Sequence, residues 1–147
     1  MELLTGEYRN SLDDKGRIPF PAKLRAELTE ETLVITQAVD KCLWLFTTSE
    51  WKNFSSKLME ATSPFSGKSR LVMRHLIAPA QSVGFDKNGR IMIPASLRDY
   101  ASLSKECVFL GVNKYMELWD VSTYKTYLEE NEPSFREASE DLGNIFL

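Results

Sequence analysis

The chain has 147 residues, of which 43% are hydrophobic and 27% charged, a balance typical of folded globular proteins that excludes a disordered chain. Its apolar runs are far shorter than the roughly 20 residues that span a bilayer, and its start lacks the basic flank of a signal peptide, so we expect a cytoplasmic protein with no membrane partner. The formal net charge of −3 argues, taken alone, against a nucleic-acid partner.

One phrase occurs twice in the chain, at residues 13–25 and again at 86–98. Asp, Gly, Arg, Ile, Pro, Ala, Leu and Arg recur at equivalent places without a gap. This identity predicts a tandem repeat. Two units of about seventy residues each lie near the lower size limit for an independent core, so we expect the two repeats to share one core.

Each repeat opens with a short segment that ends at Leu12 or Phe85, followed by a polar turn and an apolar segment. This pattern predicts a β-hairpin in each repeat. Asn88-Gly89 favours a type I′ turn, in which both central residues have positive φ. The phrase Pro-Ala-x-Leu-Arg then predicts a short helix, because proline is favoured at the first helical position. We expect these helices near 21–28 and 94–103.

Two further pairs of apolar runs predict strands, at 33–36 with 42–46 and at 107–110 with 116–119. A helix follows each pair, with Thr47 and Asp120 as the expected N-caps. A third helix is predicted over 67–78, and the spacing of Ser134 and Glu137 predicts a marginal acidic helix over 134–142.

The elements therefore predict an α+β fold, mainly β with short helices. The expected divisions are repeat 1 at 7–52, a helical connector at 53–79, repeat 2 at 80–123 and an acidic tail at 129–147.

The charges are unevenly distributed. Residues 129–147 hold six acids and one base, whereas residues 64–105 hold seven bases and two acids. The remaining positive field is modest, so one chain would bind DNA poorly, because affinity rises with the number of phosphates neutralised. Several linked copies would bind it well, since later contacts become intramolecular.

Three interpretations of the repeated Asp-x-x-x-Arg motif stay open. Asp13 with Arg17, and Asp86 with Arg90, could be ion pairs that only close tight turns. Alternatively, each aspartate fixes an arginine for DNA, because the planar guanidinium can bind phosphate or guanine with two hydrogen bonds. Catalysis by the two aspartates is the weakest interpretation, because no catalytic grouping stands beside them in the sequence.

On the DNA-binding interpretation, the expected DNA-binding residues are Lys15, Arg17, Lys87, Arg90 and Arg9. The residues expected to shape the motif are Asp13, Gly16, Asp86 and Gly89. We expect no catalytic residue, metal site, cofactor or small-molecule substrate.

For the remaining reactive residues we expect packing roles or, for His75, a packing or surface role. Cys42 and Cys107 lie in separate apolar runs without the neighbours that a zinc site requires, so we expect buried, reduced thiols. His75 lies on an expected helix without an identifiable catalytic partner. The aromatic residues within or beside the apolar runs are expected in the core or at an interface: Trp44, Trp51, Trp119 and Tyr124.

At its two motifs the chain resembles the MraZ family of tandem AbrB-like (SpoVT-AbrB) transcriptional regulators. The supporting phrases are residues 6–13, 84–90 and 117–120, and the resemblance spans most of the chain. It places the family's motif on Asp13 with Arg17 and on Asp86 with Arg90.

The resemblance implies a swapped-hairpin AbrB-like β-barrel formed by the two repeats, with a pseudo-two-fold axis within one chain. It also implies a ring-shaped homo-oligomer that binds direct repeats in double-stranded promoter DNA of a bacterial division and cell-wall gene cluster, at the nucleoid. The alternative is an oligomeric scaffold or protein-interaction module without DNA specificity.

Overall fold

A six-stranded antiparallel sheet forms the centre of the molecule, with strand order β1-β7-β8-β4-β3-β5. A separate two-stranded ribbon joins β2 to β6. The computed structural model describes residues 3–143; residues 1–2 and 144–147, which include the end of the predicted acidic tail, lie outside it. The strands are β1 (Leu4–Ser11), β2 (Arg17–Pro19), β3 (Thr32–Gln37), β4 (Leu43–Thr47), β5 (Gln81–Gly84), β6 (Arg90–Met92), β7 (Glu106–Asn113) and β8 (Tyr115–Asp120).

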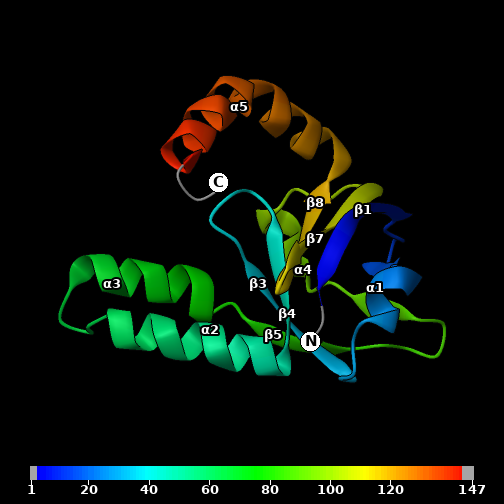
Figure 1. Cartoon of the computed structure of the whole chain (residues 1–147). Coiled ribbons are helices and arrows are strands. Elements are labelled where there is room, and N and C mark those ends of the chain that lie inside the picture. The colour runs from blue at the N-terminus through cyan, green and yellow to red at the C-terminus, as the bar shows by residue number, and fades with distance from the viewer. Residues whose placement is uncertain (1–2, 144–147) are drawn as a thin grey trace.

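The helices complete an α+β fold (Figure 1). They are α1 (Ala22–Ala26), α2 (Thr48–Ala61), α3 (Gly67–Val72), the π-helix η1 (Met73–Ile77), α4 (Ala95–Tyr100) and α5 (Val121–Asp141). Figure 1 shows α2 and α3 as an arm that projects from the sheet, and α5 as a bent helix that arches over it. Within residues 3–143, each helix is too short or too polar to cross a bilayer.

The strand pairs predicted at 33–36 with 42–46 and at 107–110 with 116–119 are confirmed as β3–β4 and β7–β8. The hairpins predicted around the repeated phrase are wrong, because their strands pair with strands of the other repeat. β1 pairs with β7, β3 with β5, β2 with β6 and β4 with β8.

Of each predicted hairpin only the tight turn is closed locally, between Asp13 and Arg17 after β1 and between Asp86 and Arg90 after β5. Strand β1 has eight residues and pairs along its whole length with β7, which also has eight. Strand β2 has only three residues and could pair with only part of β1. By hydrogen bonding the six-stranded sheet is open, with β1 and β5 at its edges.

Side chains alternate between the two faces of the sheet, and each face is covered by different elements. The inner face, which includes Phe109 and Leu118, packs against Ile18 and Ile91 of the ribbon. Leu24 of α1 and Leu97 of α4 complete this core, which both repeats share, as predicted. The outer face is covered by α2 and α5.

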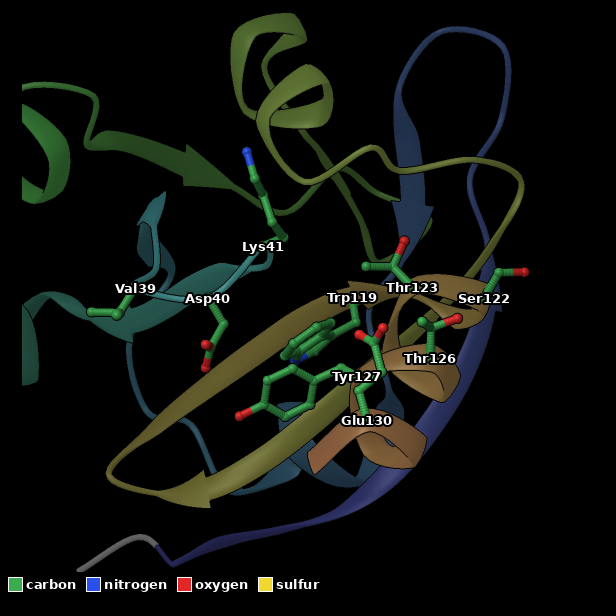
Figure 2. A pocket seen from close by; sticks show the side chains of 9 residues that line it. All are labelled: Val39, Asp40, Lys41, Trp119, Ser122, Thr123, Thr126, Tyr127 and Glu130. Carbon is green, nitrogen blue, oxygen red and sulfur yellow. The ribbon is translucent and has the colours of Figure 1, made fainter. Parts of the chain in front are cut away.

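The contact of α5 with the outer face is aromatic. The ring of Trp119 lies 5.0 Å from the rings of both Tyr124 and Tyr127. A cavity of about 550 Å³ opens beside this contact, between α5 and the turn that follows β3 (Figure 2). A second aromatic cluster joins β4 and β8 to α2, and its members are Trp44, Phe46, Trp51, Phe54 and Tyr115.

The predicted helix caps are confirmed. Thr47 accepts a hydrogen bond from the Glu50 N–H, and the Asp120 carboxylate accepts one from the Thr123 N–H. The short helices after the repeated phrase are also confirmed, although each is shorter than expected. The segment predicted as one helix over 67–78 changes at Met73 from α to π geometry, where the Ala78 N–H donates to the Met73 carbonyl.

Residues 134–141 are helical, as predicted, but the separate helix start at Ser134 is wrong. The helix that Asp120 caps, α5, instead continues from Val121 through Pro133 to Asp141. Proline has no N–H to donate to the preceding turn, and such a position bends a helix without necessarily ending it. Ser134 is therefore an interior helical residue.

Candidate nucleic-acid interface

In repeat 1 the motif is a tight turn built around Asp13. The Gly16 N–H donates to the Asp13 carbonyl at 3.0 Å, and the Asp13 N–H donates to the Arg17 carbonyl at 2.8 Å. One carboxylate oxygen accepts the N–H groups of Lys15 and Arg17 at 2.9 and 2.8 Å. The other accepts Nε of Arg17 at 2.8 Å. The carboxylate thus holds both the turn and the guanidinium.

Repeat 2 reproduces this arrangement around Asp86. Its carboxylate accepts the N–H groups of Asn88 and Arg90, and Nε of Arg90, each at 2.9 Å. Gly89 has φ +73°, but Asn88 does not adopt positive φ, so the predicted type I′ turn is wrong. The Asp86 side chain closes an Asx turn on the Asn88 N–H, which favours a different backbone at that position.

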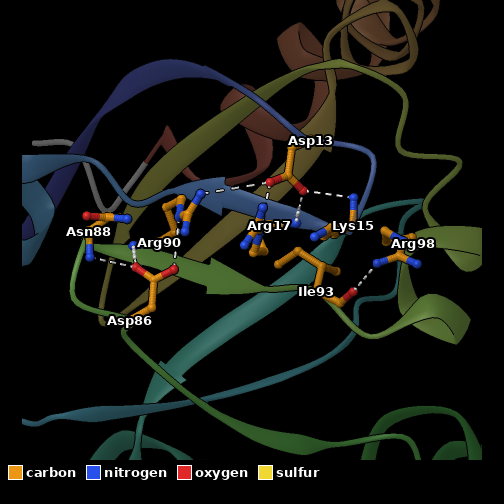
Figure 3. A network of polar contacts seen from close by, with 8 residues as sticks. All are labelled: Asp13, Lys15, Arg17, Asp86, Asn88, Arg90, Ile93 and Arg98. Atoms are coloured by element: carbon orange, nitrogen blue, oxygen red, sulfur yellow. Dashed lines mark hydrogen bonds and ion pairs between the residues drawn. The ribbon is translucent and has the colours of Figure 1, made fainter.

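The ribbon brings the two motifs together from opposite halves of the chain (Figure 3). Arg17 lies opposite Met92, Ile18 opposite Ile91, and Pro19 opposite Arg90. Because Ile18 and Ile91 point into the core, their neighbours point outward.

The side chains of Arg17 and Arg90 are 30% and 27% exposed. A terminal nitrogen of Arg90 also approaches the Asp13 carboxylate at 4.0 Å. The ribbon therefore presents two braced guanidinium groups on one surface.

The two sides of the ribbon differ at their glycines. The Arg98 guanidinium covers Gly16 and donates to the Ile93 carbonyl at 2.7 Å. Its counterpart in repeat 1, Arg25, lies instead 3.8 Å from the centre of the Phe85 ring, and the space beside Gly89 is open. Arg98 therefore covers the turn of repeat 1 at Gly16, whereas no side chain among residues 3–143 covers the turn of repeat 2 at Gly89.

The other predicted residues separate into two groups. Lys15 and Lys87 are exposed in the turns that carry the motifs. Arg9 is exposed on β1 opposite Val108, whose side chain packs on the outer face of the sheet. The structure therefore places both lysines with the motif arginines and places Arg9 on the other side of the sheet.

Comparison with known proteins decides the family. The family model of the MraZ protein matches residues 3–74 and 76–144. The chain belongs to the MraZ family.

A curated relative from Treponema denticola, named transcriptional regulator MraZ, is 58% identical over 142 residues, covering 97% of this chain and 99% of the relative. Relatives of the same name from two strains of Treponema pallidum are 46% identical over 143 residues, covering 97% of this chain and 96% of each relative. The likeness to these MraZ proteins therefore extends over almost the whole chain.

Two residues of this MraZ-family site were not predicted from the sequence. Arg98 covers the first turn, and the Asn10 side-chain amide donates to the Pro19 carbonyl at 2.8 Å. Arg98 ends the repeated phrase, so the repeat itself was a signal for it. Asn10 carries no such signal, because its contact depends on how β1 passes the ribbon.

The packing roles expected for the remaining residues agree with the structure. Cys42 and Cys107 are buried and free, and burial raises the pKa of the Cys107 thiol to about 12. His75 Nε2 lies 3.0 Å from the Ala38 carbonyl and 3.1 Å from the Tyr100 hydroxyl. These contacts tie η1 to the turn after β3.

The motif carboxyls are held ionised by their hydrogen bonds. The backbone N–H of Arg17 is the main cause that lowers the pKa of Asp13 below its ordinary value of 3.8, and the Arg17 guanidinium adds to the effect. The backbone N–H and the guanidinium of Arg90 lower the pKa of Asp86 in the same way.

Because folding lowers the pKa of both motif carboxyls, the stability of the fold depends on pH. A carboxyl whose pKa is lower in the folded state stabilises the fold fully above its unfolded pKa, and loses that effect as the pH falls through the folded pKa. We expect the difference in free energy of unfolding between the natural chain and Asp13→Asn/Asp86→Asn to be constant from about pH 5 to 7 and to shrink below about pH 4. Urea denaturation at several pH values measures it, and a difference that grows on acidification would contradict the assignment.

Proposed function

We propose that the chain is a sequence-specific DNA-binding transcriptional regulator that binds promoter DNA as a homo-oligomer, and that it is not an enzyme. The name of its relatives supports transcriptional regulation. The observation that carries DNA recognition is the pair of guanidinium groups, each braced by an aspartate, on the outer face of the β2–β6 ribbon.

The brace suits arginine for reading bases. Because Asp13 accepts Nε of Arg17, the two terminal nitrogens of that guanidinium can donate together to O6 and N7 of a guanine. Asp86 accepts Nε of Arg90 in the same way, although one terminal nitrogen of Arg90 also lies 4.0 Å from the Asp13 carboxylate. A two-stranded ribbon fits the major groove, where those acceptors lie. Holding the arginine before DNA arrives reduces the entropy lost on binding. Lys15 and Lys87, at the turns beside the ribbon, supply phosphate contacts.

The acidic total charge is compatible with this function because of where the acids lie. The acidic residues of α5 belong to a helix that packs on Val108 and Trp119, on the outer face of the sheet. The ribbon packs on the inner face. The sheet therefore separates the acidic helix from the proposed DNA surface, and salt weakens interactions between charges over about 8–10 Å.

The finer features of the family extend the proposal. We propose that this chain binds direct repeats in the promoter of a bacterial division and cell-wall gene cluster. We also propose that it assembles as a ring and lies in the cytoplasm at the nucleoid. We also propose that the sheet and the ribbon together form the swapped-hairpin, pseudo-two-fold AbrB-like barrel. The exchange of strands between repeats supports that barrel.

Selection of bound fragments from genomic DNA, followed by affinity measurements on the selected sequence and on random DNA, tests the function. We expect recovered fragments to carry direct repeats and to bind at least about 1,000-fold more tightly than random DNA. Equal affinity for both sequences would remove the assignment of specificity.

The two lysines are expected to act differently from the two arginines. Lys15→Ala/Lys87→Ala should weaken binding to operator and random DNA by the same factor, because phosphates carry no sequence information. The slope of log affinity against log salt should fall by about 1 for each phosphate that the variant no longer neutralises. Fluorescence anisotropy across a salt series measures it, and an unchanged slope would exclude phosphate contact.

Met92 is expected to contribute to base recognition. It lies on the outer face of the ribbon opposite Arg17, and its side chain is 53% exposed. An apolar side chain at this place can contact the methyl group of thymine. Met92→Ala should lower affinity for the operator by about 10-fold, the effect of losing roughly 1.5 kcal/mol of apolar burial, and leave random DNA unaffected. Equal loss on both DNAs in competition assays would contradict this role.

A second candidate function is the oligomeric scaffold without DNA specificity. Exposed apolar side chains on the arm and on α5, such as Phe65 and Phe135, favour it as an alternative. Gel shifts with promoter and random DNA separate the two functions. The scaffold predicts no shift of either DNA at modest salt.

A further inference from the structure

The two tight turns beside the ribbon differ in the side chain at one equivalent position. The backbone N–H of Lys15 donates to the Asp13 carboxylate at 2.9 Å, and that of Asn88 donates to the Asp86 carboxylate at 2.9 Å. The two residues therefore occupy the same place in the same kind of turn. Repeat 1 carries an ammonium group there, whereas repeat 2 carries a neutral amide.

The side-chain amide of Asn88 is not needed to build its turn. Only the backbone of this residue closes the turn, and lysine fills the same place in repeat 1. Asn88 is exposed, and its amide makes no hydrogen bond with any other residue within 3–143. Apart from its two chain neighbours, nothing lies within 4 Å of a Cβ added at the adjacent Gly89. The one acceptor and two donors of the amide are therefore available to a ligand.

The side chains of the two turns and of the motif arginines form a row (Figure 3). Because β2 and β6 are antiparallel, the turns that precede them lie at opposite ends of the ribbon. The Asp13 carboxylate, which holds Arg17, lies 4.0 Å from Arg90, so the two arginines are at the centre. The row runs from Asn88 through Arg90 and Arg17 to Lys15. It has equivalent groups at its centre and different groups at its ends.

The two end groups suit different features of DNA. An asparagine amide can accept from N6 of adenine and donate to N7, and this pattern distinguishes adenine from the other bases in the major groove. Lys15, at the other end, is proposed above to contact phosphate, which carries no sequence information. The end groups therefore add a base pair to one side of the site only.

We infer that Asn88 recognises an adenine and thereby gives each ribbon a direction on DNA. A half-turn about the pair of Ile18 and Ile91 exchanges Arg17 with Arg90, so the arginines alone read a site alike in both directions. Asn88 has no equivalent at the other end and removes this ambiguity. Copies that face the same way along DNA then require sites that point the same way, which is the arrangement of a direct repeat.

The inference rests on the proposed DNA-binding function and adds to it a residue, a base and an orientation. Its first test uses full-length protein and duplexes of the sequence recovered from genomic DNA, with each base pair substituted in turn. For the natural chain, we expect one A·T pair, on one side of the site, to weaken binding about 10–100-fold when it is replaced, the discrimination of one bidentate base contact. Fluorescence anisotropy measures each affinity.

Asn88→Ala should bind all four base pairs alike at that position and keep its discrimination at every other position. Its affinity for random DNA should not change, because no charge is lost. Asn53→Ala, at an exposed asparagine on α2 outside the ribbon, is the matched control and should keep the discrimination of the natural chain.

A second variant exchanges the two end groups without changing composition or charge. In Lys15→Asn/Asn88→Lys, the requirement for adenine should leave its original position and appear at the equivalent position on the other side of the site. Both positions are exposed, and both residues already occur in this kind of turn, so folding should persist, and circular dichroism checks it.

Three results would overturn the inference alone. They are an Asn88→Ala variant that keeps the preference for adenine, a loss that is equal on random DNA, and an exchange variant whose adenine stays on its original side. Equal loss on random DNA would make Asn88 a phosphate contact. A natural chain that shows no discrimination at any position would instead overturn the proposed function, and this inference with it.

Discussion

Arg17→Ala/Arg90→Ala is expected to weaken operator binding by about 100-fold or more, because each bidentate arginine–guanine contact contributes about 1–3 kcal/mol of discrimination. The fold should persist. Each aspartate still accepts two backbone N–H groups in its turn, and a partly exposed ion pair contributes only about 0–1 kcal/mol to stability. Fluorescence anisotropy at two salt concentrations measures the affinity, and light scattering checks that the oligomer is intact.

Two controls separate recognition from charge. Lys114→Ala/Lys125→Ala removes the same charge from exposed positions outside the ribbon and should change affinity far less. Arg17→Lys/Arg90→Lys keeps the charge but loses the planar fork, so it should retain binding to random DNA and lose preference for the operator. If the double alanine variant binds the operator with the affinity of the natural chain, the motif has a structural role alone.

Gly16→Ala is expected to destabilise the fold by about 2–3 kcal/mol. Gly16 has φ +84°, a conformation that costs residues with a Cβ about 1–2 kcal/mol. An added Cβ would also overlap the Arg98 guanidinium and displace it from the Ile93 carbonyl, with the loss of a hydrogen bond of about 1 kcal/mol. Urea denaturation measures the change in free energy of unfolding.

Gly89→Ala is the matched comparison. Gly89 has φ +73°, but the space beside it is open, so only the backbone cost of about 1–2 kcal/mol applies. The repeats should therefore differ in sensitivity although their motifs are alike in sequence. Equal losses at the two glycines would show that Arg98 does not stabilise the first turn.

Local features of the fold could be predicted from the sequence. The caps at Thr47 and Asp120, the short helices after the repeated phrase and the strand pairs β3–β4 and β7–β8 each depend on a few neighbouring residues. The turn around Asp13 is local in the same sense, since its carboxylate binds groups within four residues.

The remaining features depend on distant partners. The turn after β1 is as compatible with a hairpin as with two diverging strands, and the eight-residue match with β7 decides between them. Ser134 and Glu137 have the spacing of a cap, yet the helix that Asp120 caps continues through them because Pro133 bends it without ending it. The contact of Arg98 with the opposite turn requires the ribbon first.

The pairing of β1 with β7 has a consequence during synthesis on the ribosome. Leu4 pairs with Asn113, and Ser11 pairs with Glu106. The first half of the chain therefore emerges with two strands, β1 and β2, that lack their partners β7 and β6 until those parts of the second half have been translated. Such nascent, unpaired strands are prone to aggregate, so this protein should fold late and benefit from chaperones that shield them.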